Sequence, residues 1–210
     1  MTDYFIQVIG TNCTGKSQLV GSLKDYFTDS SIYVVGLYKK SKTFPDLYTG
    51  GIDLTRTRDI SPNKEDGKKL GLISKKGNIT NKGRHRLLEE AWFSDKKVVV
   101  CEGFTITGYK AYIRKYIDEY CLKKPRAIIV VLIEKNPELR KSEMIIRSGG
   151  KSFTEKRLSN FIEYEKDAKK VFDACLQNNI ATKSLIISGI EDYNKVQEEF
   201  NSLVRECLEE

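Results

Sequence analysis

The sequence predicts an α/β fold in which a five-stranded parallel sheet carries helices on both faces. Short hydrophobic runs recur along the 210 residues, and the stretches between them place apolar residues three and four apart, as one face of a helix does. Strands that alternate with helices in this way form parallel sheets buried on both sides. The length suits a single domain covering residues 1–210.

The expected strands and helices follow one another from the N-terminus. Tyr4–Ile9 is expected to form a short buried strand, and Ser17–Phe27 has apolar residues at helical spacing. Further hydrophobic runs predict strands at Ile32–Leu37, Lys97–Cys101 (KVVVC), Ala127–Ile133 (AIIVVLI) and Ser184–Ser188 (SLIIS). Further helices are expected at Asn81–Phe93, Gly108–Leu122, Pro137–Arg147, Thr154–Gln177 and Glu191–Leu208.

The segment from Lys39 to Asn81 does not fit this alternation. It is rich in Gly, Lys and turn-forming residues, and a structureless connection of this length is uncommon unless it has a function. In open α/β sheets, ligands bind beyond the carboxyl ends of the strands, and this segment leaves the end of the second strand. We therefore expect residues 39–86 to bind a ligand, which in a group-transferring enzyme would be the acceptor.

The composition narrows the class of protein. No run of 18 apolar residues is present, and the first ten residues lack the basic start and small-residue cleavage site of a secretory signal. The five cysteines are odd in number and form no C-x-x-C pair. We therefore expect a cytoplasmic protein without membrane partners, structural zinc or disulfides.

The positive charge is concentrated in one part of the chain. The net charge is +7, and residues 39–86 hold 13 Lys and Arg against 5 Asp and Glu, a net of +8. The remaining residues, with 23 basic and 24 acidic side chains, carry a net charge of −1. Such a segment suits a nucleic-acid partner, and on charge alone a solvated lysine-rich surface explains it equally well.

The residues after the first expected strand fit a phosphate-binding motif. The pattern G-x-x-x-x-G-K-[ST], known as the P-loop, is matched by Gly10, Thr11, Asn12, Cys13, Thr14, Gly15, Lys16 and Ser17. A helix that begins here leaves backbone N–H groups unpaired, and the glycines let the backbone curl around an anion. The motif predicts a site for ATP, with Lys16 on the β- and γ-phosphates and the Ser17 hydroxyl on Mg²⁺.

A carboxylate follows the strand run KVVVC. Glu102 comes directly after this run, where a carboxylate in a P-loop protein orients Mg²⁺ directly or through water. We assign Glu102 to the metal site and to catalysis. The alternative is a surface glutamate at a strand end.

Arginines surround a glycine pair between two expected helices. Arg140, Arg147 and Arg157 lie on either side of Gly149 and Gly150. Arginines on a flap hinged at the glycines can close over a transferring phosphoryl group and exclude water. We predict a lid at residues 138–157 with Arg140 and Arg147 as catalytic residues, and an exposed pair of charged helices is the alternative.

The stretch NKGRHRLLEEAWF supplies two more arginines. Arg84 and Arg86 lie two residues apart near a helix start and so diverge around its axis. One of them can bind an acceptor phosphate, or both can be solvated. His85 has no second histidine or nearby cysteine with which to bind a metal, and we expect a structural role for it.

Together these motifs resemble the thymidylate kinase branch of the P-loop nucleoside and nucleotide kinases. The resemblance rests on the P-loop, the stretch GRHRLLEEAWFSDKKVVVCEGF and the stretch EMIIRSGGKSFTEKRLSNFIEYEKDAKKVF. It implies a three-layer P-loop NTPase fold, Arg84 or Arg86 on the acceptor phosphate, Glu102 at the position of the family's metal-orienting Asp, and Arg140 and Arg147 in the lid.

Two motifs of that family are altered on the acceptor side. Its Asp-Arg-Tyr is replaced by Glu102-Gly103-Phe104, and its T-R-E-P loop is reduced to Thr55-Arg56-Thr57-Arg58-Asp59. The identity of the acceptor is therefore less constrained by the resemblance than that of the donor.

Three functions remain open. The first is an ATP- and Mg²⁺-dependent kinase whose acceptor is a pyrimidine deoxynucleotide, bound by Arg56, Arg58, Asp59, Arg84 and Arg86. The second is a kinase for a hydroxyl in DNA, such as a hydroxymethylated pyrimidine base or a strand end, with Asp46, Asp53, Asp59 or Glu102 as the general base. The third is a nucleotide-switched binding protein, for which we see no clearly spaced water-positioning residue. The oligomeric state also stays open, a homodimer included.

Overall fold

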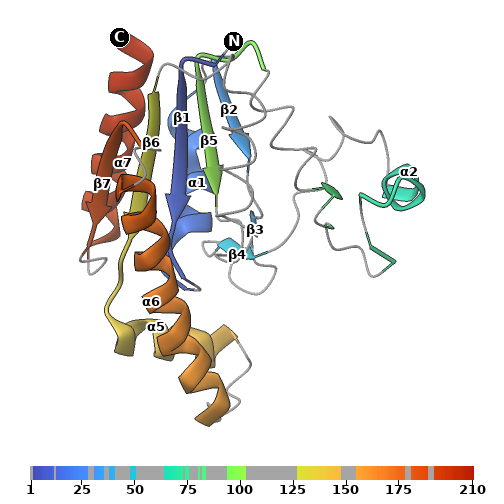
Figure 1. Cartoon of the computed structure of the whole chain (residues 1–210), viewed down its shortest axis with the longest axis vertical. Coiled ribbons are helices and arrows are strands. Elements are labelled where there is room, and N and C mark those ends of the chain that lie inside the picture. Colours follow the sequence, from blue (N-terminus) through green and yellow to red (C-terminus); the bar gives the residue numbers. More distant parts are fainter. Residues whose placement is uncertain are drawn as a thin grey trace.

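The protein is built on a five-stranded sheet in which all neighbouring strands are parallel (Figure 1). A computed structural model describes residues 2–11, 13–27, 31–35, 38–40, 48–50, 64–72, 74–75, 80, 82–83, 94–102, 127–147, 155–177, 181–188 and 192–210. The strand order is β2-β5-β1-β6-β7. The predicted α/β class and the predicted five parallel strands are both confirmed.

The strands coincide closely with the hydrophobic runs. They are β1 (Tyr4–Ile9), β2 (Ile32–Val35), β5 (Val98–Glu102), β6 (Ala127–Ile133) and β7 (Lys183–Ile187). The predictions for β1 and β6 were right at both ends, whereas β5 begins and ends one residue later than predicted and β7 one residue earlier. Residues 36 and 37, the predicted end of the second strand, lie outside the described residues.

Four long helices accompany the sheet in the described part of the chain. They are α1 (Lys16–Tyr26), α5 (Pro137–Arg147), α6 (Glu155–Gln177) and α7 (Tyr193–Glu209), each within two residues of its predicted bounds. The helix predicted at Gly108–Leu122 lies outside the described residues, and of Asn81–Phe93 only Lys82 and Gly83 are described. Both of these are helical, and the Thr80 hydroxyl accepts a hydrogen bond from the Gly83 N–H as an N-cap does.

The core lies on the two faces of the sheet. On one face, alternate residues of β1, namely Tyr4, Ile6 and Val8, join a buried cluster with side chains of α1 and α7. On the other face α6 lies against β6 and buries its own apolar stripe (Figure 1). None of the described helices has both the length and the apolar character needed to cross a membrane.

Polar side chains are also buried where α1 meets α7. The Ser22 hydroxyl donates a hydrogen bond of 2.6 Å to Gln197 Oε1, and Gln197 Nε2 donates one of 2.9 Å to Asn201 Oδ1. The Tyr193 hydroxyl also donates to Gln197 Oε1. Because these hydrogen bonds satisfy buried groups on both helices, they fix how α7 sits on α1.

The segment between Lys39 and Asn81, which did not fit the alternation of strands and helices, contains short regular elements among its described residues. Strands β3 (Tyr38–Lys40) and β4 (Tyr48–Gly50) form an antiparallel pair next to α1. A short helix, α2 (Lys64–Lys69), lies to the side of the sheet (Figure 1). These elements are too short for their sequence periodicity to reveal them.

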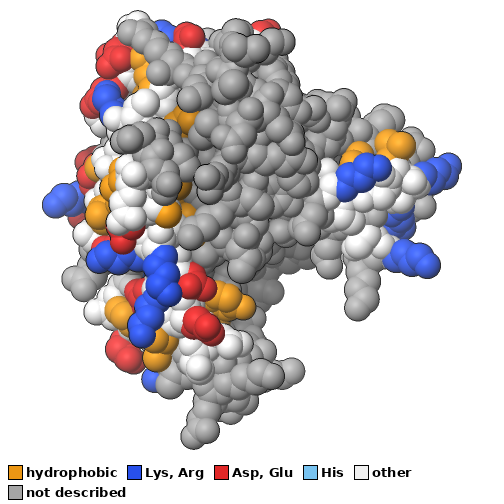
Figure 2. Space-filling view, in the orientation of Figure 1, with side chains coloured by type: hydrophobic (Ala, Val, Ile, Leu, Met, Phe, Trp, Pro, Cys, Tyr) orange, Lys and Arg blue, Asp and Glu red, His pale blue; other side chains and the backbone are white. Residues whose placement is uncertain are grey.

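Helix α2 ends in a defined turn. The Gly71 N–H donates to the Lys68 carbonyl and the Leu72 N–H donates to the Gly67 carbonyl, while Gly71 has a left-handed φ of 71°. This pair of hydrogen bonds is a Schellman motif, which needs glycine at the left-handed position. Three lysines, Lys69, Lys75 and Lys82, are exposed on the surface at and after α2 (Figure 2).

Candidate phosphate-binding site

The loop between β1 and α1 turns the chain sharply at the carboxyl edge of the sheet. Two of its residues have left-handed backbone conformations, Cys13 with φ 61° and Gly15 with φ 92°. Glycine adopts this conformation without strain, whereas cysteine does not, so the fold holds Cys13 in a costly geometry. Gly15 is the N-cap of α1, whose first turn holds no acidic residue, and the positive end of the helix dipole is therefore not neutralised there.

Gly10 is required by the space around it. A Cβ on Gly10 would lie 2.8 Å from Thr14 Oγ1 and 2.9 Å from the Ile133 carbonyl oxygen. The second of these atoms belongs to the backbone of β6 and cannot move aside cheaply. The first glycine of the motif thus lets the loop pass close to the neighbouring strand.

Hydrogen bonds inside the loop converge on one carbonyl. Lys16 Nζ donates a hydrogen bond of 2.6 Å to the Thr11 carbonyl oxygen, and Thr14 Oγ1 donates one of 3.0 Å to the same atom. The Thr11 hydroxyl is buried and has no hydrogen-bond partner among the described residues. The loop is therefore curled on itself, with its lysine turned back across it and a polar hydroxyl facing inward.

Ser17 and Glu102 meet at the foot of the loop. The Ser17 hydroxyl donates a hydrogen bond of 2.6 Å to Glu102 Oε1. The register of β1 with β5 pairs Val8 with Glu102, so the carboxylate emerges beside the end of β1. Glu102 is only 5% exposed, which excludes the surface glutamate considered from the sequence. Burial and the charge of Glu102 together raise the pKa of the neighbouring Cys101 thiol.

The chemistry of this pair suits a hard cation that is shared with a ligand. A hydroxyl and a carboxylate are oxygen donors of the kind that Mg²⁺ prefers. In the described part of the chain, no three His, Cys, Asp or Glu side chains cluster as a self-sufficient metal site. In phosphotransferases Mg²⁺ is usually held by one or two protein groups and completes its coordination with phosphate oxygens and waters.

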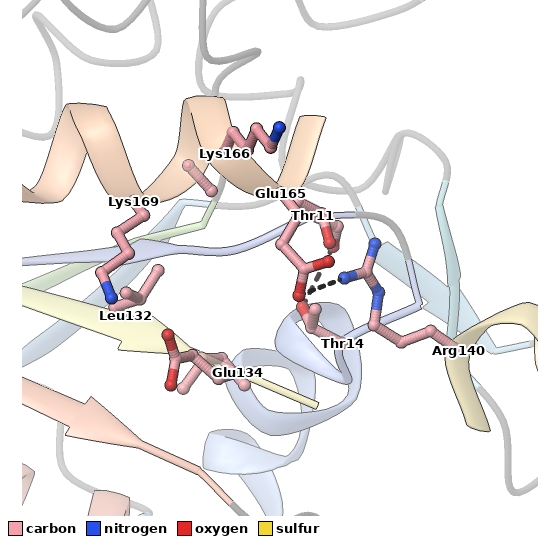
Figure 3. Close-up of a pocket in the computed structure, with 10 residues that line it drawn as sticks. Thr11, Thr14, Leu132, Glu134, Arg140, Glu165, Lys166 and Lys169 are labelled. Atoms are coloured by element: carbon pink, nitrogen blue, oxygen red, sulfur yellow. Dashed lines mark hydrogen bonds and ion pairs between the residues drawn. The ribbon is translucent and has the colours of Figure 1, made fainter. Parts of the chain in front are cut away.

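A pocket of about 140 Å³ lies on the other side of the loop, toward β6 and α6 (Figure 3). Its wall includes Thr11 and Thr14 of the loop and Arg140 of α5. Arg140 is 1% exposed, and its Nη1 lies 3.0 Å from Glu165 Oε1 of α6. Burial lowers the pKa of Arg140, and the charge of Glu165 and its hydrogen bond oppose that shift.

The start of α5 fixes the position of Arg140. Asn136 Oδ1 accepts hydrogen bonds from the Glu138 and Leu139 N–H groups, and the Arg140 N–H donates to the Asn136 carbonyl. Asn136 thus caps the helix directly after β6. Arg140 lies beside the loop between β1 and α1 because this cap begins α5 at the carboxyl end of the neighbouring strand.

The structure brings together only some of the residues predicted from the sequence. Gly10, Thr11, Cys13, Thr14, Gly15, Lys16 and Ser17 form one loop with Glu102 and Arg140 around it. Arg147 ends α5, and Arg157 lies in α6, but their side chains are not described. The remaining candidates lie outside the described residues, and these are Asn12, Asp46, Asp53, Arg56, Arg58, Asp59, Arg84, His85, Arg86, Gly149 and Gly150.

Glu165 is the residue that sequence reasoning missed. In α6 the buried positions include Ala168, Phe172 and Cys175, at spacings of four and three. Glu165 lies three residues before Ala168, on the same face. A carboxylate within an apolar stripe is a signal for a buried partner, and here that partner is Arg140.

Comparison with known proteins does not connect the chain to a family. No protein-family model matches the sequence, and a search of curated proteins finds no significant match.

Proposed function

We propose that this protein is an ATP- and Mg²⁺-dependent kinase of the P-loop type, whose acceptor is a pyrimidine deoxynucleotide. The observation that carries the proposal is the hydrogen bond between Ser17 and Glu102 at the foot of the loop. The sequence marks these two residues separately as metal ligands, and parallel pairing of β1 with β5 brings them into contact. Glu102 thereby contacts Ser17, the residue of the motif whose hydroxyl is expected to bind Mg²⁺.

The donor side follows from the loop itself. Backbone N–H groups at the start of α1 and the uncompensated helix dipole favour the phosphates of ATP. When ATP binds, Lys16 would release the Thr11 carbonyl and bind the β- and γ-phosphates instead. Its positive charge would stabilise the transition state of phosphoryl transfer more than the ground state. The close packing at Gly10 holds the start of the loop against the sheet.

Ser17 and Glu102 would hold Mg²⁺ in this kinase. When bound, Mg²⁺ supplies positive charge to the β- and γ-phosphate oxygens. The Ser17 hydroxyl would contact it directly, and Glu102 would orient its waters or bind it from the side of β5. The existing hydrogen bond keeps both oxygens at the same place before the ligand arrives.

Arg140 and the helix pair α5 and α6 lie on the opposite side of the loop. A buried guanidinium beside the phosphate loop is suited to neutralising charge on the phosphates. We retain residues 138–157 as the lid of the proposed enzyme, with Arg147 as its second arginine. A lid that excludes water would favour transfer to the acceptor over hydrolysis.

The acceptor would bind on the side of the loop away from Arg140, over β2 and the segment that follows β2 in the chain. Strands β3 and β4, which belong to this segment, lie against α1 near the carboxyl edge of the sheet (Figure 1). We assign the acceptor phosphate to Arg84 or Arg86 and further contacts to Arg56, Arg58 and Asp59. This assignment rests on the resemblance to thymidylate kinases.

A hydroxyl within DNA is the second candidate acceptor. The net charge of +8 between residues 39 and 86 favours it, because a polyanion gains from many lysines and a single nucleotide does not. The exposed lysines Lys69, Lys75 and Lys82 belong to that segment (Figure 2). The free nucleotide remains the first candidate because the resemblance along the chain supports it.

Transfer of labelled phosphate tests the proposal and separates the acceptors. The protein is incubated with ATP labelled at the γ-phosphate, together with deoxynucleosides, their monophosphates, or DNA with ordinary or hydroxymethylated pyrimidines. We expect label in a pyrimidine deoxynucleoside monophosphate. Label in DNA alone would replace the first acceptor by the second, and release of inorganic phosphate without any transfer would contradict a kinase.

A further inference from the structure

Arg140 and Glu165 form an ion pair whose two members are buried to very different degrees. The Arg140 side chain is 1% exposed, whereas that of Glu165 is 43% exposed. Arg140 belongs to the first turn of α5, which Asn136 fixes to the end of β6. Glu165 lies at the edge of the pocket and can turn toward water at little cost. Exchange of partners at this pair would therefore move the glutamate and leave the arginine in place.

The pocket around this pair is suited to an anion. Arg140 and Lys169 bring positive charge to it, and Glu134 and Glu165 are its carboxylates, whereas the amino group of Lys166 points away from Arg140 (Figure 3). Thr11 and Thr14 of the phosphate loop complete the same wall. An anion that entered from the loop would therefore meet Arg140, and Glu165 is the group that already binds that arginine.

We propose that the Glu165 carboxylate occupies a phosphate subsite of the nucleotide site, and that a phosphate group of the bound nucleotide displaces it from Arg140. This inference rests on the proposed function, because it takes the ligand of the loop to be a nucleotide. No covalent bond changes, and one oxyanion replaces another on the same guanidinium. Glu165 is thus a determinant of affinity that acts through Arg140.

The cost of burying a charge explains why an internal anion is needed. A guanidinium removed from water is stable only with a hydrogen-bonded counterion, and the carboxylate supplies one when no ligand is bound. A phosphate oxygen supplies an equivalent charged hydrogen bond to arginine. The arginine would then be paired in both states, and the affinity for ATP would be reduced by the free energy needed to displace Glu165. A nucleoside without phosphates cannot displace it.

Replacement of the carboxylate by an amide tests the exchange. Calorimetric titration gives the Kd of ATP and of adenosine for the wild type, Glu165→Gln and the matched control Glu163→Gln, an exposed position on α6. We expect Glu165→Gln to bind ATP about three- to tenfold more tightly, as befits the loss of a competing charge in a half-exposed pair. Binding of adenosine, and of both ligands to Glu163→Gln, should match the wild type.

The outcomes distinguish this inference from the proposed function. Unchanged or weaker ATP binding by folded Glu165→Gln would mean that the pair only joins α5 to α6, and would overturn the inference alone. Absence of ATP binding in the wild type would overturn the proposed function. If Glu165→Gln does not fold, Glu165→Asp keeps the charge but shortens its reach, and it should tighten ATP binding to a smaller extent. Unchanged or weaker ATP binding by Glu165→Asp would equally overturn the inference.

Discussion

The Ser17 hydroxyl and the Glu102 carboxylate are 85 positions apart in the sequence, yet they lie 2.6 Å from each other. Their contact depends on the order of the strands, because β5 is the direct neighbour of β1 and ends at the same edge. A loop that can cradle phosphates and a carboxylate that can orient a cation thereby become one site. Substitutions in the loop and at Glu102 should therefore affect the same ligand.

Replacing Lys16 by Ala should abolish most phosphoryl transfer while the fold stays intact. The side chain is half-buried and donates its hydrogen bond to a carbonyl of its own loop, so it contributes little to core packing. Loss of its charge should lower kcat by about a hundredfold or more. The measurement is the initial rate of label transfer, with thermal unfolding as the test of folding. Lys195→Ala, on the exposed side of α7, is the control and should keep the wild-type rate.

Replacing Gly10 by Ala should damage nucleotide binding through sterics alone. The added methyl group would lie 2.8 Å from Thr14 Oγ1 and 2.9 Å from the Ile133 carbonyl oxygen, so the loop must move away from β6. We expect ATP affinity to fall by about tenfold or more, together with a lower unfolding temperature. Gly71→Ala provides the comparison, because nothing lies within 4 Å of its Cβ position and only its left-handed φ is strained. That variant should lose about 1 kcal/mol of stability and keep its ATP affinity. Equal loss of ATP binding in the two variants would argue against a specific role for the loop geometry.

Replacing Gln197 by Ala should destabilise the whole domain without touching the site. Gln197 is 2% exposed, and its loss removes the donor to the buried Asn201 Oδ1, while the Ser22 hydroxyl keeps only the Leu19 carbonyl, 2.9 Å away, as acceptor. The free energy of unfolding should fall by about 2 kcal/mol or more, as measured by urea denaturation. Glu198→Ala, one residue along and exposed, should change it by less than about 0.5 kcal/mol. Similar values for the two variants would show that this network does not hold α7 on α1.

The lysines near α2 distinguish the two acceptors. If DNA is the substrate, replacing Lys68, Lys69, Lys75 and Lys76 by Gln should weaken DNA binding and flatten its dependence on salt. The slope should change by roughly one unit for each DNA phosphate that the variant no longer neutralises. If the acceptor is a free monophosphate, the same substitutions should leave its KM unchanged. Titration with DNA between low and moderate salt makes the comparison, and no binding at low salt would exclude the polymer.

The central strands were predictable because they are buried on both sides. In β1 every residue is buried, so its hydrophobic run and the strand coincide from Tyr4 to Ile9. At the edge of the sheet, β7 is largely exposed, and its hydrophobic run misplaced both ends by one residue. The fully buried β5 was misplaced by the same amount, so burial reveals that a strand is present but does not fix its ends. Strands β3 and β4 are three residues each and lie against α1, so tertiary contacts define them and local pattern does not.

The sequence predicted the individual residues of the site better than the contacts between them. The motif identified the loop and Glu102 marked the neighbouring strand end, because both are local features of sequence. The pairing of Arg140 with Glu165 depends on how α5 and α6 pack, and no spacing within either helix specifies it. The sequence assigned Arg140 to a lid without indicating its partner, and in the structure it lines the pocket beside the loop. Its catalytic role remains a prediction.

Titration of ATP with and without Mg²⁺, in the wild type and in Glu102→Gln, tests whether the loop and Glu102 form one Mg²⁺–ATP site. The amide keeps the size of the side chain and can still accept the hydrogen bond from Ser17, but it lacks the charge that a cation needs. We predict that Mg²⁺ strengthens ATP binding to the wild type and that most of this gain is lost in Glu102→Gln, while binding without the metal is preserved. An equal effect of Mg²⁺ on both proteins, or no binding of ATP to either, would contradict the assignment of this loop and Glu102 to a Mg²⁺–ATP site.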